Sequence, residues 1–292
     1  MGVHGDGQHV CAVNVNRRAN DVNERKDIYA VKSAFEVIHY DFKDRRDITI
    51  IPVADVHLGS KECRQKEFEK FLKTVQEDDE KYLILAGDLI NNTTRSSVAN
   101  IFEETMRPVE QKRKMAEMLR PVKDRILCIT TGNHERRSVR DADDDPIYDI
   151  AVKLDLEDVY RPEMAFLHIQ MGNGRQNHDV NPSYVIGVTH GAGGGGTTGA
   201  SVNRSERFAG VIEGLDVLVT GHTHKPSITS PYRLVVNPST KKVYMRETRV
   251  VVCTSWLDYG GYAMEKMMAP SGFVQQKIVL GGNRKRIEIT TG

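Results

Sequence analysis

Residues 47–59 of this 292-residue chain are DITIIPVADVHLG, an apolar run that stops at two polar residues two positions apart. The run is short, rich in β-branched residues and followed directly by Asp55, which is typical of a buried strand that ends at a polar loop. The same arrangement recurs four times. YLILA precedes Asp88, RILCIT precedes Asn133, SYVIGVT precedes His190 and LDVLVT precedes His222. The chain therefore contains five predicted strands that each end at a polar cluster.

Stretches with helical spacing of apolar residues lie between the first strands. Residues 62–77, 97–119 and 145–156 are the candidates, with Pro108 as a break or new start and Pro146 at a first helical position. Strands that alternate with helices predict a layered α/β fold.

The two ends of the chain differ in character from this middle part. Residues 1–46 are predicted to be an N-terminal extension in which 31–42 form either a strand or a short helix, and residues 47–292 to be one domain. Four further strands are predicted at 234–236, 242–253, 273–280 and 284–290, with short turns between them. We expect these to be antiparallel and to give a second sheet.

Composition narrows the class of protein. A hydrophobic fraction of 39% supports a core, and 41 basic against 40 acidic residues give a formal charge of +1 rather than the clear basic excess of many nucleic-acid binders. The four cysteines form no Cys-x-x-Cys pair, which argues against a zinc ribbon, and Cys128 and Cys253 are expected to be buried thiols. No signal-peptide or membrane-spanning pattern is present in the sequence, so we expect a cytoplasmic protein.

The polar clusters have the residue types of a metal site. In α/β sheets, ligands bind where the carboxyl ends of the strands meet the loops. Asp55 and His57 are two positions apart, so in an extended segment they would point the same way and share one metal ion. Carboxylate, imidazole and amide donors without thiolates suit Mn²⁺, Fe or Zn²⁺ in a catalytic site, and a carboxylate such as Asp88 can bridge two ions.

The ordered set of motifs resembles a known family. Asp-x-His at 55–57, Gly-Asp at 87–88, Gly-Asn-His-Glu at 132–135, His190 and Gly-His-x-His at 221–224 together resemble the calcineurin-like metallophosphoesterases over roughly residues 47–225. Any one motif alone is weak, whereas five in order behind strands are specific. The resemblance implies a two-sheet β-sandwich flanked by helices, with four layers in the order α/β/β/α, and a phosphoester hydrolase activity.

The resemblance also implies roles for individual residues. Two divalent metal ions would be held, Mn²⁺ by preference with Fe, Zn²⁺ or Ni²⁺ as alternatives, and a metal-bridging hydroxide would attack phosphorus. His134 would contact the phosphate or protonate the leaving oxygen. The implied ligands are Asp55, His57 and His224 for the first ion, Asn133, His190 and His222 for the second, and Asp88 as the bridge.

One position departs from the family pattern. Many members carry an Asp three residues after the bridging Asp, where it orients the catalytic His, but this chain has Asn91. An amide oxygen could still accept a hydrogen bond from the imidazole of His134. It would stabilise an imidazolium less than a carboxylate does.

The motifs fix the reaction class better than the substrate. Leu58-Gly59 after the first His resembles the DNA-repair exonuclease branch of the family. Gly-Asn-His-Glu also occurs in the Ser/Thr protein phosphatases, but this chain differs from those phosphatases at Leu58 and at residues 91–93. We therefore predict a phosphodiesterase or nuclease whose partner is DNA or a nucleotide. A phosphomonoesterase and a non-catalytic, metal-bound scaffold subunit are the alternatives.

Several other features have ordinary explanations that compete with functional ones. The Gly-rich loop 191–199 is interpreted as a rim loop rather than a phosphate loop, since it lacks Gly-Lys-Ser/Thr and no helix is expected directly after it. Trp256, Tyr259 and Tyr262 are expected to pack in the core rather than stack on bases. Phosphate binding and surface ion pairing stay equally open for Arg136, Arg137, Arg140, Arg204 and Arg207, and no role is assigned to His4, His9, His39, His168 or His178.

Overall fold

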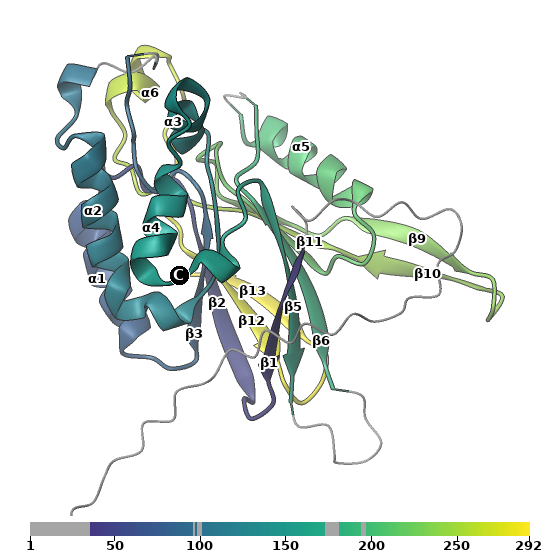
Figure 1. Ribbon diagram of the computed structural model, residues 1–292. Helices are drawn as coiled ribbons and strands as arrows, with labels where there is room; N and C mark the ends of the chain where they lie inside the picture. The colour runs from purple at the N-terminus through teal and green to yellow at the C-terminus, as the bar shows by residue number, and fades with distance from the viewer. Residues whose placement is uncertain (1–35, 96, 98–100, 173–180, 194–196) are drawn as a thin grey trace, which may run out of the picture.

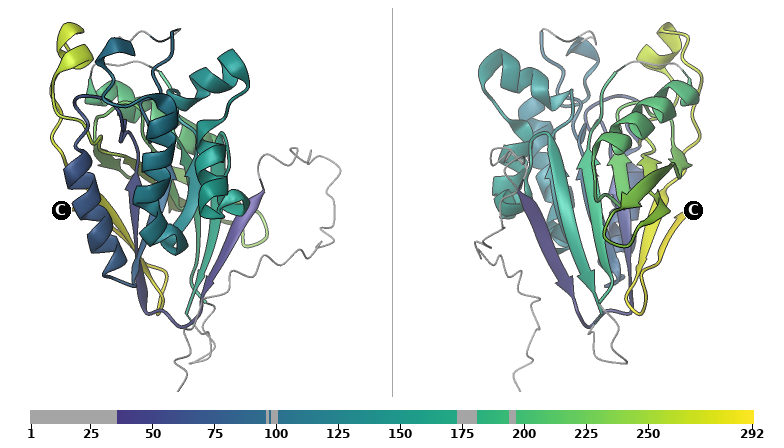
Figure 2. Two further views of the ribbon diagram at one scale, coloured as in Figure 1. Left: turned by 60° about the vertical axis from the view of Figure 1, so that its left-hand side comes forward. Right: turned by 90° about the vertical axis from the view of Figure 1, so that its right-hand side faces the viewer.

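The computed structural model describes residues 36–95, 97, 101–172, 181–193 and 197–292. Two β-sheets lie face to face, and helices cover the outer face of each (Figures 1 and 2). Apolar side chains from both sheets, among them Ile50, Ile84, Leu167 and Ile186, form the core between them. The predicted four-layer α/β/β/α arrangement is confirmed.

The five-stranded sheet contains the first three predicted strands. β2 (Asp47–Val53), β3 (Lys81–Ala86) and β4 (Ile126–Thr130) are parallel neighbours, so their carboxyl ends meet at one edge of the sheet. Both faces of these strands are buried, which explains why their sequences are continuous apolar runs. On β2, Ile50 faces the inter-sheet core, whereas Ile51 faces the helices.

The helices on the outer face of this sheet begin and end near the predicted positions. α1 (Gln65–Gln76) buries Phe68, Leu72 and Val75, and α2 (Pro108–Leu119) begins at the predicted proline. α4 (Pro146–Leu154) is capped by the Asp145 carboxylate, which accepts from the backbone N–H groups of Ile147 and Tyr148. The remaining helical segments on this side are α3 (Glu135–Ala142), the 3₁₀ turns η2 (Ile101–Glu103), η3 (Arg120–Arg125) and η4 (Glu157–Val159), and, after β11, α6 (Gly261–Glu265).

The six-stranded sheet has the order β1-β5-β6-β7-β11-β8. Its centre is β6 (Ser183–Thr189) and β7 (Val217–Thr220), the last two predicted strands, which are parallel. β5 (Met164–Met171) pairs antiparallel with β6, and β1 (Val37–Phe42) pairs parallel with β5. Part of the segment 1–46 is thus an edge strand. Residues 1–35 lie outside the described residues, and the predicted domain boundary at residue 46 stays a prediction.

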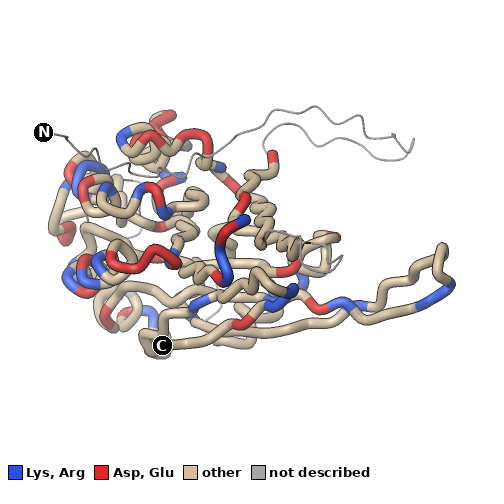
Figure 3. Tube along the Cα trace, turned by 90° about the horizontal axis from the view of Figure 1, so that it is seen from below, with Lys and Arg blue, Asp and Glu red and all other residues tan. Residues whose placement is uncertain are grey.

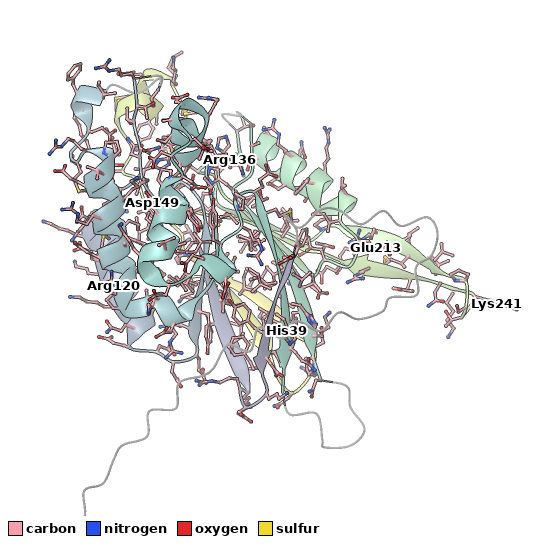
Figure 4. The ribbon with its side chains drawn as sticks, viewed as in Figure 1. His39, Arg120, Arg136, Asp149, Glu213 and Lys241 are labelled. Carbon is pink, nitrogen blue, oxygen red and sulfur yellow. The ribbon has the colours of Figure 1, made fainter. Side chains whose placement is uncertain are left out.

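Two expectations for the fold were wrong. The tail does not form a second sheet of its own: β12 (Gln276–Gly281) and β13 (Ile287–Thr291) extend the first sheet, β8 (Ser227–Thr229) and β11 (Arg249–Val252) extend the second, and β9 (Tyr232–Asn237) with β10 (Lys242–Glu247) forms a separate hairpin tipped by Lys241 (Figure 4). A helix does follow the Gly-rich loop, because α5 (Thr198–Val211) begins there and covers the outer face of the six-stranded sheet.

Charged residues are mixed along the molecule. In the view of Figure 3, basic and acidic segments alternate, in keeping with the formal charge of +1. None of the described helices is long and apolar enough to cross a membrane.

A buried tyrosine joins the two sheets. Tyr184, on β6, is fully buried; its hydroxyl donates to the carbonyl of Gly281 at 2.6 Å and accepts from the backbone N–H of Arg286 at 2.9 Å. We expect Tyr184→Phe to lower the free energy of unfolding by about 1–3 kcal/mol, because it leaves these buried groups without a partner. Urea unfolding measures the change; Tyr148→Phe, at a ring that is 47% exposed, is the control. Equal stability of the two variants would contradict this role.

Candidate metal centre

All five predicted polar clusters lie at the carboxyl ends of strands that meet at one edge of the sandwich. The clusters after β2, β3 and β4 come from the five-stranded sheet, and those after β6 and β7 come from the six-stranded sheet (Figure 1). The structure brings all seven predicted ligand side chains together there. Asp55, Asp88, His57 and His190 are buried, and the others are partly buried.

One group of donors consists of Asp55, His57 and His224. Nε2 of His224 lies 3.1 Å from Oδ1 of Asp55, and Nε2 of His57 lies 3.2 Å from Nε2 of His224. Nε2 of His57 is also 3.8 Å from Oδ1 of Asp55. The three side chains therefore converge on one point and could hold one cation.

A second group lies beside the first. Oδ1 of Asn133 is 2.6 Å from Nδ1 of His222 and 3.0 Å from Nε2 of His190. Oδ2 of Asp88 stands between the groups, 3.2 Å from Nε2 of His190 and 3.8 Å from Nε2 of His57. The arrangement offers two adjacent cation positions with Asp88 common to both.

The hydrogen bonds of His190 show that a cation fits. Its Nδ1 lies 2.8 Å from the carbonyl of Ala86, which can only accept, so Nδ1 carries the proton. In the neutral imidazole, Nε2 then presents a lone pair to the oxygens of Asn133 and Asp88, which are also acceptors. A metal ion placed among these three atoms would satisfy all of them.

The acid–base properties of the site reflect the same crowding of acceptors. Burial on its own would lower the pKa of His190, yet the nearby carboxylates of Asp88 and Asp55 raise that pKa to about 10. Burial would likewise raise the pKa of Asp88, but His190 and His134 hold it well below its usual range. Without metal, protons on histidines supply the positive charge that the carboxylates require.

The backbone under the ligands is in an unusual conformation. Asp55, His57, Asp88, His222 and His224 have φ values of 56°, 49°, 50°, 71° and 54°, in the left-handed region that non-glycine residues rarely adopt. Asp55 and His57 do share a site, but the segment that carries them is not extended as their spacing had suggested. Both residues are left-handed, and the loop that carries them runs beside the loop after β3, where their backbone N–H groups donate to the carbonyls of Gly87 and Asp88.

Two glycines leave the space that these side chains occupy. A Cβ atom on Gly132 would lie 2.0 Å from Oδ1 of Asp88, and one on Gly221 would lie 2.7 Å from Oδ2 of Asp55. Both distances are far below van der Waals contact. The glycines that precede Asn133 and His222 are thus required by close approach to the carboxylates.

His134 lies beside the donors rather than among the predicted ligands. Its Nδ1 donates to the backbone carbonyl of Asn91 at 2.8 Å, so Nε2 is left available, 3.9 Å from Oδ2 of Asp88. Burial, with His57 and Arg137 nearby, lowers the pKa of His134 to about 3, so the imidazole is neutral at pH 7. The expectation that the Asn91 amide oxygen could orient the ring was wrong, because the main chain of Asn91 does so.

The side chain of Asn91 has a different partner. Its Nδ2 donates to Oε1 of Glu104 at 2.5 Å and to Oγ1 of Thr93 at 3.2 Å. Glu104 also accepts from Nε2 of Gln111 at 2.6 Å. An aspartate at position 91 would face the Glu104 carboxylate, which explains why an amide occupies this position.

Glu135 is a residue whose role the sequence analysis did not assign. Its fully buried carboxylate accepts from the backbone N–H groups of Asp88, Ile90 and Gly132 at 3.1, 3.1 and 2.9 Å. It joins the loop after β3 to the loop after β4. Its place as the fourth residue of the Gly-Asn-His-Glu motif could have indicated a role for it.

The arginines, aromatic residues and histidines whose roles the sequence left open lie in different parts of the structure. Arg137 lines the cavity at the donors, whereas Arg136 donates to the carbonyl of Pro162 and Arg140 pairs with Asp141. Trp256 is buried against Phe68, Phe71 and Phe273, as predicted, but Tyr259 is 46% exposed and lines the cavity. His39, labelled in Figure 4, pairs with His168 across β1 and β5, and neither lines the cavity at the donors. His4, His9, His178 and the side chain of Tyr262 lie outside the described residues.

A cavity of about 560 Å³ opens at the donors. Its walls include the 3₁₀ turn η2, the start of α3 and the segment after β11. The donor side chains His57, Asp88, Asn133, His222 and His224 line it together with His134. A ligand in this cavity would contact the donors directly.

Two sheets whose carboxyl ends share one cluster of His, Asp and Asn donors define the class of metallophosphoesterases. The model of the calcineurin-like phosphoesterase family matches residues 48–226, and the chain belongs to this family. The family predicted from the motifs is confirmed.

Comparison with individual proteins gives more distant likenesses. The DNA polymerase II small subunit of Thermoplasma acidophilum is 28% identical over 133 residues, which cover 44% of this chain and 26% of that protein. The protein of that name from Methanocaldococcus jannaschii is 32% identical over 108 residues, covering 32% of this chain and 18% of that protein. The chain thus spans about a quarter or less of these relatives. A metallophosphoesterase structure from Sphaerobacter thermophilus is 11% identical with a TM-score of 0.40, covering 84% of this chain and 88% of that one.

The pairing of Asn91 with Glu104 predicts the outcome of restoring the family residue. We expect Asn91→Asp to lower the free energy of unfolding by about 1–3 kcal/mol, because it sets a buried carboxylate against the half-buried carboxylate of Glu104. Adding Glu104→Gln should recover most of the loss, because the amide and carboxylate then change places. Thermal and urea unfolding of both single variants and the double variant measure this. Stability of Asn91→Asp equal to that of the unaltered chain would rule the pairing out.

Proposed function

We propose that this chain hydrolyses phosphodiester bonds in DNA or nucleotides with the aid of two divalent cations. The observation that carries the proposal is the convergence of seven donor side chains, five of which line one cavity, with donor atoms 2.6–3.8 Å from one another. Members of a family that had lost catalysis would be expected to lack several donors, and this chain lacks none of those that the family motifs specify.

The proposed ligand assignment follows the two groups. Asp55, His57 and His224 would hold one cation, Asn133, His190 and His222 the other, and Asp88 both. When bound, such ions neutralise charge on the phosphoryl oxygens and make a water molecule acidic enough to supply a nucleophile near neutral pH. Mixed nitrogen and oxygen donors without a thiolate favour Mn²⁺, with Fe, Zn²⁺ or Ni²⁺ as alternatives.

His134 is proposed to act on the substrate directly. The hydrogen bond from Nδ1 to the Asn91 carbonyl fixes the tautomer and the ring orientation, so Nε2 is directed beside Asp88. Once Nε2 takes up a proton, which the negative charge of a bound phosphate favours, it can donate a hydrogen bond to a phosphoryl oxygen or a proton to the leaving oxygen. Arg137, which also lines the cavity, adds positive charge for the phosphate.

Three observations favour a diester over a monoester. Leu58 and Gly59 follow the first His as in the exonuclease branch, and Leu58 is fully buried beneath the site. The cavity volume of about 560 Å³ falls within the range of about 300–1,000 Å³ that encloses small organic ligands, larger than a phosphate alone requires. The relatives named as DNA polymerase II small subunits add a nucleic-acid context, although the matched part is a fraction of their length.

Two variants test the proposal against a matched control. With Mn²⁺, we expect His134→Ala to reduce turnover of single-stranded DNA or bis-p-nitrophenyl phosphate by about 10²–10⁴-fold, the range for loss of a general acid or base, while two ions per chain stay bound. Asp88→Asn should abolish turnover and reduce the bound metal, because it weakens both positions. His39→Ala removes a histidine outside the site and should change neither quantity.

The outcomes separate the candidate functions. Cleavage of the monoester p-nitrophenyl phosphate alone would replace the proposal with a phosphomonoesterase. Two bound ions without turnover of any of these substrates would support a metal-bound scaffold subunit. Metal analysis by mass spectrometry beside each assay keeps a loss of ligand binding distinct from a loss of chemistry.

A further inference from the structure

Lys225 is a buried cation directly beside the proposed metal centre. It follows His224 in the chain, and only 8% of it is exposed. It lines the cavity at the donors and also a second cavity of about 360 Å³. The two cavities share Lys225, Ala269 and Ser271, so they adjoin at this side chain.

The charge of Lys225 has no counter-ion among the described residues. Its Nζ donates to the backbone carbonyl of Ala269 at 2.5 Å, and no carboxylate of the described chain lies within 4.0 Å of it. Other partly buried lysines are paired, as Lys112 is with Asp144 and Asp149 at 3.0 and 2.7 Å. A buried ammonium with one neutral acceptor is costly and keeps two N–H donors for an anion.

The second cavity is suited to an anionic group. Thr197 and Thr198 line it at the start of α5, a helix of 14 residues whose first turn presents backbone N–H groups and the positive end of its dipole. Pro226, Pro270 and Gly272 complete its wall. No Asp or Glu lines this cavity within the described part of the chain.

We propose that Lys225 binds a second phosphate of the substrate, next to the phosphodiester held at the metal centre. The inference rests on the proposed function and narrows its substrate class to nucleotides and strands that carry a phosphate adjacent to the scissile bond. Lys225 directly follows the proposed ligand His224, and consecutive Cα atoms are ~3.8 Å apart. Both side chains line the first cavity, so a phosphate bound by Lys225 would lie close to the metal centre. A charge-assisted hydrogen bond of this kind contributes about tenfold or more in binding.

Thymidine dinucleotides that share one scissile bond test the inference. TpT carries the diester alone, whereas pTpT and TpTp add a 5′ or a 3′ phosphate. With Mn²⁺, we expect kcat/KM for one of the two phosphorylated forms to exceed that for TpT by about tenfold or more. Lys225→Met should abolish this preference and Lys225→Arg should keep it. Lys61→Met, which removes a lysine from the same cavity where it pairs with Glu103, should keep it too.

A binding measurement makes the test independent of turnover. Titration of the metal-free protein with pTpT and TpTp by calorimetry should give a dissociation constant about tenfold higher for Lys225→Met, with no change for Lys61→Met. Equal kcat/KM for all three dinucleotides, or a preference that survives Lys225→Met, would overturn the inference and leave the diesterase function intact. Failure to cleave any dinucleotide, with monoester turnover retained, would overturn the proposed function; the calorimetry would still decide whether Lys225 binds phosphate.

Discussion

A single buried carboxylate, that of Glu135, holds together two of the five loops from which the proposed ligands project. Its two oxygens accept three backbone N–H groups, from Asp88 and Ile90 after β3 and from Gly132 after β4. Both oxygens are occupied by donors that have no other partner in these loops. The positions of Asp88 and Asn133 depend on this link, because each lies within one residue of a backbone group that Glu135 holds, and His134 directly precedes Glu135 in the chain.

The loops that carry the proposed ligands are strained. Five of the seven proposed ligands have left-handed backbone conformations, each of which costs about 1–2 kcal/mol for a residue with a side chain. Strain of this size persists only where the surroundings determine the conformation. The sheets supply the rigid base, and hydrogen bonds such as that from the backbone N–H of His222 to the Asp55 carboxylate add further restraint. Cations bound between the side chains of facing loops would restrain these loops further.

Much of the fold and the composition of the site could be predicted from the sequence. Strands β2, β3, β4 and β7 are continuous apolar runs because most residues on both of their faces are buried, and a site residue follows each of them. β6 is only partly buried on one face, but a site residue, His190, follows it too. β5 was missed because its burial alternates and no polar cluster follows it. α5 was missed because it packs through Ser201, Ser205 and Ala209, small residues at helical spacing that carry no apolar signal.

The detailed geometry of the site was predicted less well from the sequence. The spacing of Asp55 and His57 gave the right neighbours for the wrong reason, since both residues are left-handed and the segment that carries them is not extended. The orientation of His134 by the Asn91 carbonyl could not be predicted, because a backbone acceptor leaves no trace in residue identity. The Asn91 side chain is explained only by Glu104, 13 positions away in a segment without a motif.

The proposed function requires two cations, one in each group of donors, that Asp88 joins. Electron paramagnetic resonance during titration of the metal-free protein with Mn²⁺ tests it most directly, because ions about 3.5–4 Å apart are magnetically coupled. We expect saturation at two ions per chain, with a coupled dinuclear signal that is lost in Asp88→Asn. An isolated mononuclear signal at saturation, or coupling that survives Asp88→Asn, would contradict it.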